Sequence, residues 1–335
     1  MTLARDLSTL PRAAAPSPED GWIPDAEPRF VGVLADAWAA TNDDDKPTAM
    51  GTRLRHSDAG KCSRYLGYVA AGIAKSDPMD LTGVWNVTLG SLLHDLWQQA
   101  LVAKFPDSTV ETTFGWDDLD ASCHVDALIR WRDPEPDPDR ALMGTTIVYE
   151  LKTIGGYGYK AAVGKARRGT PAEGPKREHV LQAALNGLAA DADEVVIGYL
   201  AKETISASVG KGMSDLARFA AEWTMTRDEF EPLALAEKAR MAGVLELVDA
   251  GDLPARKFPT GTLPRGAEIV DPTTGRWEVH GDPVPIGPLG ASDMVPQVVD
   301  TGTWWACGYC SHRTLCATTE AGRIPIASAR TEGRS

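Results

Sequence analysis

Two carboxylates and a lysine stand at the ends of apolar, strand-like runs of this sequence. The run 146–149 ends in Glu150-Leu151-Lys152, and the run 124–129 carries Asp126 among apolar neighbours. Side chains alternate along a strand, so Glu150 and Lys152 are expected on one face and Leu151 in the core. If the two runs pair, Asp126 and Glu150 can share a divalent cation, which prefers carboxylate oxygens. The alternative for these charged residues alone is an ion pair on the surface.

A histidine lies within a predicted amphipathic helix upstream of these strands. The helix is expected over residues 83–104, because apolar residues recur there at helical spacings. His94 within it is, by its type alone, most simply a partly buried structural residue. Gly90, one turn earlier, leaves room for a strand or a phosphate to approach closely.

These residues together resemble a known nuclease pattern. Asp126 followed by Glu150-Leu151-Lys152 resembles the PD-(D/E)XK signature in the form used by RecB-type nucleases. The segment Gly90 to His94 is similar to the Gly-x-x-x-His of that family, and Gln182 to its glutamine downstream of the lysine. The family often has a tyrosine one turn after that glutamine, whereas this chain has Asn186.

The resemblance implies both a fold and roles for the residues. The fold is α/β, with a restriction-endonuclease-like core in which helices flank a mixed central sheet. His94, Asp126, Glu150 and the backbone carbonyl of Leu151 are expected to hold Mg²⁺ or Mn²⁺. Lys152 is expected to orient the attacking water or neutralise charge on the phosphate, and Gln182 to position the site or the DNA end.

The cysteines form a second feature of the sequence. There are five, and an odd number predicts metal or cluster ligation over a disulfide framework. Cys62 with Cys307, Cys310 and Cys316 resembles the iron–sulfur arrangement of the CRISPR-associated and AddB-type RecB-like exonucleases. The resemblance implies a 4Fe–4S cluster that joins the N- and C-terminal segments. Zinc fits four thiolates equally well, and His312 is able to replace a cysteine. Cys123 is expected to be a buried free thiol.

A basic segment follows the lysine of the motif. Residues 153–177 contain the single acid Glu173 in a chain whose net charge is −13. A solvated loop is one interpretation; the position next to Lys152 favours a mobile clamp on the phosphate backbone of DNA. The expected DNA-binding residues are Lys160, Lys165, Arg167, Arg168, Lys176 and Arg177.

Composition sets the remaining expectations. A length of 335 residues with 43% hydrophobic content permits a sizeable core. Neither a membrane-spanning run nor a signal-peptide layout is found, which predicts a cytoplasmic protein without membrane contact. The predicted organisation is a flexible arm over 1–50, a nuclease domain over 51–319 with the cluster region at Cys62 and 300–319, and a disordered tail over 320–335.

Local patterns also predict the secondary structure around these residues. Ser57 or Asp58 is expected to cap a helix with Cys62 in its first turns, and a hairpin turn is expected at 271–275. Strands are predicted at 110–114, 122–131, 144–152, 194–200 and 206–209, and further helices at 178–190 and 227–250.

The sequence therefore predicts a metal-dependent DNA exonuclease acting on DNA ends or single strands. A helicase or recombination protein is the expected further partner, because the chain has no P-loop of its own. The alternatives are a non-catalytic DNA-binding or assembly subunit of a recombination or repair complex, and a zinc-containing nuclease.

Overall fold

A computed structural model describes residues 51–116, 118–131, 145–165, 172–255, 267–271, 276–279, 310–320 and 322–332. The chain divides into a unit of residues 1–44 and a unit of residues 45–335, and the described residues all belong to the second. The predicted arm over residues 1–50 lies outside them.

A mixed sheet forms the centre of the second unit, in the order β1-β3-β4-β5-β6, with β2 paired along β3. Neighbouring strands are parallel in the pairs β1–β3 and β4–β5 and antiparallel in β2–β3, β3–β4 and β5–β6. The strands are β1 (Leu54–Arg55), β2 (Thr109–Trp116), β3 (Leu119–Trp131), β4 (Thr145–Ile154), β5 (Glu194–Ala201) and β6 (Ala220–Thr226).

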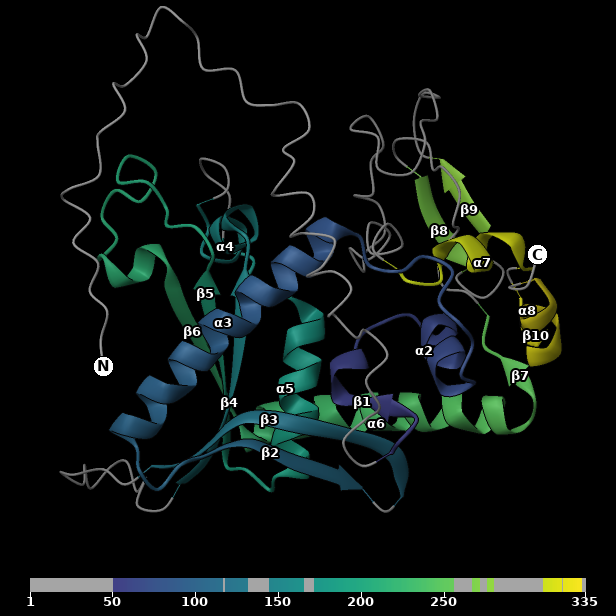
Figure 1. Cartoon of the computed structure of the whole chain (residues 1–335), viewed down its shortest axis with the longest axis horizontal. Coiled ribbons are helices and arrows are strands. Elements are labelled where there is room, and N and C mark those ends of the chain that lie inside the picture. Colours follow the sequence, from purple (N-terminus) through teal and green to yellow (C-terminus); the bar gives the residue numbers. More distant parts are fainter. Residues whose placement is uncertain are drawn as a thin grey trace, which may run out of the picture. The chain divides into compact units, whose positions relative to one another are not determined.

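Helices cover both faces of this sheet (Figure 1). Helix α3 (Leu81–Lys104) packs through Leu101 onto Tyr149 and Leu151, while α5 (Arg177–Ala189) and α6 (Arg227–Asp249) cover Val148 on the other face. Adjacent residues of β4 thus fill opposite cores, and burying each large apolar side chain contributes about 2 kcal/mol. The expected mixed sheet flanked by helices is confirmed.

Helix α3 approaches the sheet closely at one glycine. A Cβ at Gly90 would lie 2.8 Å from Oγ1 of Thr153, near the end of β4. Any larger residue would therefore displace the Thr153 side chain or the helix. The close approach expected at Gly90 is made by a residue of strand β4. Because α3 lies close to the sheet at this point, His94, one turn later on the helix, lies over the sheet.

Residues 322–332 form regular structure, where the sequence predicted a disordered tail over 320–335, and residues 333–335 lie outside the described residues. The C-terminal segment forms α7 (Arg313–Thr318), β10 (Ile324–Pro325) and α8 (Ile326–Glu332), and β10 pairs with β7 (Asp252–Leu253). Fully buried Arg64 explains the order, because its guanidinium donates to the backbone carbonyls of Pro254, Glu320 and Gly322. A buried cation satisfied by backbone oxygens holds the segment in place.

The first helix begins later than predicted. Cys62 itself is the N-cap of α2 (Ser63–Ala70), and its Sγ accepts the N–H of Tyr65 at 3.4 Å. The proposed caps at Ser57 and Asp58 instead lie in the 3₁₀ turn η3 (His56–Asp58). Cys62 was expected in the first turns of a helix and instead precedes the first turn as its N-cap.

Two further elements differ from the sequence pattern. The predicted strand at 206–209 is a turn, in which the N–H of Gly210 donates to the Ser206 carbonyl at 2.8 Å, and β6 follows the 3₁₀ turn η4 (Leu216–Arg218). The basic segment contains the helix α4 (Gly156–Ala162).

The predicted hairpin is confirmed by the antiparallel pairing of β8 (Ala267–Asp271) with β9 (Arg276–Val279).

In the described part of the chain, no helix is long and apolar enough to cross a membrane.

Candidate metal centre

The pairing of strand β3 with strand β4 ends next to the two carboxylates, Asp126 and Glu150. The last paired residues are Ala127 and Tyr149, so the next residues in register are Asp126 and Glu150. Oδ2 of Asp126 accepts the backbone N–H of Leu151 at 2.7 Å. A side chain thus satisfies a backbone donor at the strand end. This bond orients the Asp126 carboxylate and leaves Oδ1 facing α3.

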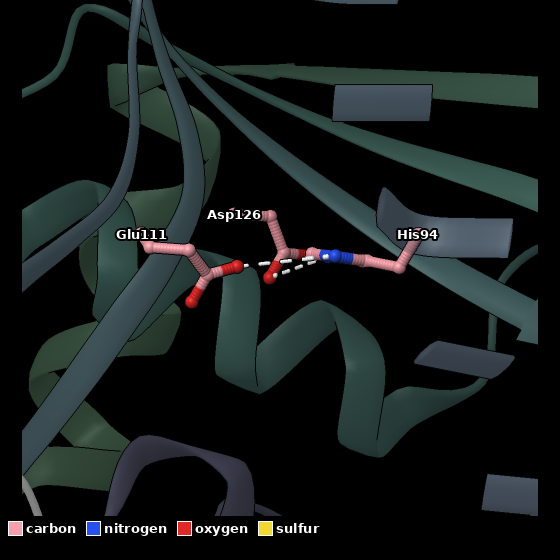
Figure 2. Close-up of side chains that lie close together, drawn as sticks. All are labelled: His94, Glu111 and Asp126. Atoms are coloured by element: carbon pink, nitrogen blue, oxygen red, sulfur yellow. Dashed lines mark ion pairs between the residues drawn. The ribbon is translucent and has the colours of Figure 1, made fainter. Parts of the chain in front are cut away.

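His94 of α3 meets that second oxygen. Its Nε2 lies 3.0 Å from Oδ1 of Asp126, and its Nδ1 lies 3.8 Å from Oε1 of Glu111 (Figure 2). The hydrogen bond to Asp126 and the nearby carboxylates raise the pKa of His94, although burial opposes them. In the described residues this is the one group of three or more such side chains whose ligand atoms all lie within 4.8 Å of one another.

Glu111 of β2 was not among the residues predicted from the sequence. The pairs Val110–Ala127 and Thr112–Val125 place it opposite Asp126, and its backbone adopts a left-handed φ of 51°. In the sequence it is a single acid among strand-forming residues, which is typical of a solvent-facing position. Only the register of β2 on β3 shows that it shares a site with Asp126.

Glu150 is wholly buried and engaged by three donors. Lys152 Nζ and Gln182 Nε2 donate to its Oε1 at 2.5 and 2.6 Å, and Asn186 Nδ2 donates to Oε2 at 2.7 Å. Burial and the charge of Asp126 raise the pKa of Glu150 to about 7, against the opposing effect of Lys152. A surface ion pair, the alternative for the charged motif, is wrong, because Glu150 has no exposed surface.

Lys152 and Gln182 therefore lie where the sequence predicted, on the Glu150 face of β4 and next to it on α5. Burial disfavours the charged form of Lys152, but the charges of Glu150 and Asp126 raise its pKa. The ammonium group is held in a largely buried position against the Glu150 carboxylate. Leu151 packs into the opposite core, as expected.

Asn186, the position that departs from the family pattern, connects Glu150 to a buried histidine. Its Oδ1 lies 2.9 Å from Nδ1 of His56, and burial lowers the pKa of His56 to about 4. The neutral imidazole thus donates from Nδ1, which orients the Asn186 amide so that Nδ2 faces Glu150. The ring of His56 also stacks on Trp116, with 4.4 Å between centroids.

The donors of this centre fit a divalent cation. An imidazole nitrogen and two carboxylates converge from α3, β2 and β3, with a third carboxylate next in register. Carboxylate oxygens suit Mg²⁺ and Mn²⁺, and imidazole suits transition metals. The group that the resemblance placed together is thus partly assembled: His94 and Asp126 touch, while Glu150 is turned toward α5.

Three cysteines of the predicted cluster, Cys62, Cys310 and Cys316, lie in the described residues, but their sulfur atoms do not all lie within 4.8 Å of one another. Burial, together with the charges of Cys62 and Cys316, raises the pKa of the Cys310 thiol to about 11 against a hydrogen bond from the His312 backbone. His312 is buried beside them, with its ring 5.0 Å from that of Tyr68. Cys307 lies outside the described residues. Cys123 is buried, as predicted.

The predicted DNA-binding residues are distributed over several elements. Lys160 belongs to α4 and Lys165 follows it, while Lys176 and Arg177 start α5 and are exposed. The backbone N–H of Lys176 donates to the Tyr199 hydroxyl at 2.8 Å, which ties the end of the segment to β5. Arg167 and Arg168 lie outside the described residues.

Comparison with known proteins adds little to this geometry. No family model and no curated protein matches the chain. A solved structure titled "Crystal structure of SSO0001" is similar over 65% of this chain and 86% of that chain, with 14% sequence identity and a TM-score of 0.37.

Proposed function

We propose that this chain is a metal-dependent deoxyribonuclease acting on DNA ends or single strands. The observation that carries the proposal is the two-sided contact of Asp126, which bonds Leu151 through one oxygen and His94 through the other. The buried Glu150–Lys152 pair stands directly beside it. Burying such a pair is costly, and ionisable groups with shifted pKa values cluster at functional sites.

His94 and Asp126 are proposed to hold Mg²⁺ or Mn²⁺, with Glu150 and the Leu151 carbonyl as further ligands. When bound, such a cation lowers the pKa of a water molecule and neutralises charge on a phosphate. Lys152 places an ammonium charge beside the reacting phosphate or the water. Gln182 holds Oε1 of Glu150, so Glu150 reaches the cation only by sharing or breaking a bond to one of its present donors.

The DNA backbone is proposed to lie along the basic residues that follow Lys152. The four exposed or partly exposed cations of this set that the structure describes give local positive charge in an acidic chain. Because the chain has no P-loop, a helicase or recombination partner would supply unwinding.

We also propose that Cys62, Cys307, Cys310 and Cys316 hold a 4Fe–4S cluster, with zinc as the alternative. The electrostatic influence of Cys62 and Cys316 on the Cys310 thiol supports this. Such a centre would link α2 to the C-terminal segment and stabilise the fold.

The test is digestion of end-labelled single- and double-stranded DNA with and without Mn²⁺. Wild type is expected to release labelled products only with the cation, and Asp126→Asn and Lys152→Ala to release none. Lys211→Ala, which removes an exposed lysine elsewhere, serves as the control and should cleave normally.

Unchanged cleavage by either site variant would refute the assignment. Wild-type protein that binds DNA without cutting it under any cation would instead support the non-catalytic DNA-binding subunit.

A further inference from the structure

Glu111 faces the His94–Asp126 pair from β2, although the nuclease resemblance assigns it nothing (Figure 2). We propose that Glu111 is a ligand of the divalent cation, so that His94, Glu111 and Asp126 together form its binding site. The inference rests on the proposed function, since it concerns the same cation.

The strand register brings two negative charges to one place. Glu111 and Asp126 stand opposite each other on antiparallel strands, and opposite residues project to the same face. Like charges directly opposite are destabilising. The imidazole of His94 reaches both carboxylates but offers at most one positive charge. A divalent cation compensates the pair fully, which is a physical reason for the two acids to share this position.

A separate side chain keeps Glu111 in place. Gln98 of α3 donates from Nε2 to Oε1 of Glu111 at 2.7 Å and to the backbone oxygen of Asp126 at 2.9 Å. It therefore bridges the two strands at the rung that carries the carboxylates. The left-handed backbone of Glu111 is unfavourable for a residue with a Cβ, so the surrounding contacts must offset that strain.

The Glu111 carboxylate is more accessible to a cation from solvent than the Glu150 carboxylate is. Glu150 is fully buried and both its oxygens accept hydrogen bonds from protein donors. The Glu111 side chain is 52% exposed, and among the described residues its Oε2 accepts no hydrogen bond. Glu111 can thus bind a cation arriving from solvent without disturbing a buried bond, whereas Glu150 must share or break one.

The donor types also match one cation. A set of one imidazole and two carboxylates favours Mn²⁺ over Mg²⁺, because imidazole is a poor ligand for Mg²⁺.

The experiment measures Mn²⁺ affinity of the purified full chain from the EPR signal of unbound Mn²⁺. Glu111→Gln removes the charge and keeps the shape. Asp95→Asn is the matched control, because it removes an exposed acid next to His94 in the chain. Thermal unfolding without cation reports whether each variant is folded, and the rise in melting temperature with Mn²⁺ gives a second measure of binding.

The expected result is a dissociation constant about 10–100-fold higher for Glu111→Gln and unchanged for Asp95→Asn. If Glu111→Gln does not fold, Glu111→Asp replaces it, since aspartate tolerates the left-handed backbone but withdraws the carboxylate by one methylene; its constant is expected to rise about tenfold.

A constant within about twofold of wild type for the folded variant overturns the ligand role and leaves the nuclease proposal intact. Wild type that takes up no Mn²⁺ overturns both. Wild type that binds Mn²⁺ through Glu111 but never cleaves DNA overturns the nuclease proposal alone.

Discussion

Replacing Asn186 with Ala should destabilise the fold far more than its size suggests. The change removes the hydrogen bond to the buried Glu150 carboxylate and the bond to His56. A bond to a charged group contributes about 1.5–3 kcal/mol and one between neutral groups about 1 kcal/mol. The expected loss is therefore about 3 kcal/mol, or roughly 10 °C in melting temperature for a domain of this size.

Gln182→Ala is the matched comparison. It removes one bond to the same carboxylate from the same helix, and Gln182 is only partly buried. Gln182→Ala should therefore lower the free energy of unfolding by about half as much as Asn186→Ala does. Urea unfolding of wild type and both variants at pH 7.5 gives the free energies of unfolding. The reasoning is refuted if Asn186→Ala costs under about 1 kcal/mol, or no more than Gln182→Ala.

Three further predictions follow from other parts of the molecule. Cys62→Ser and Cys316→Ser should remove the brown colour and iron of anaerobically purified protein, and a colourless wild type containing zinc would select the alternative centre. The pKa of His56 is lowered to about 4, below its unfolded value near 6.5, so the folded state binds fewer protons between these values and loses stability as pH falls from 6.5 to 4. Between pH 6.5 and 4 the free energy of unfolding of His56→Gln should therefore fall less steeply than that of wild type, with slopes that differ by about 1.4 kcal/mol per pH unit. Parallel curves for the two proteins would show that His56 does not titrate as described. Gly198→Ala should lower the free energy of unfolding by about 2 kcal/mol, because the new Cβ would lie 2.1 Å from the Tyr149 hydroxyl. Gly155→Ala, whose Cβ would have no atom within 4 Å, should change it little. Calorimetry measures both variants, and equal effects would contradict the reasoning.

Local patterns were sufficient for the elements that position the site. The β-branched run at 146–149 and the helical spacing around His94 predicted β4 and α3, because both depend on periodicities that a short window contains. The alternation along β4 also predicted correctly which face Glu150 and Leu151 occupy.

Long-range partners were beyond these patterns. Glu111 joins the site only through the register of β2 on β3, and Asn186 acquires its role from His56, which lies 130 residues away in the sequence. Strand β6 begins with two alanines and a glutamate, which are poor strand formers, and it exists because it pairs with β5. The C-terminal segment is ordered by buried Arg64, a contact that composition cannot indicate.

The position of the cation tests the central claim most directly. Anomalous diffraction from crystals soaked in Mn²⁺ should show one strong peak within coordination distance of His94 Nε2 and Asp126 Oδ1, with Glu111 turned toward it. No peak there, together with one elsewhere in the chain, would contradict the account.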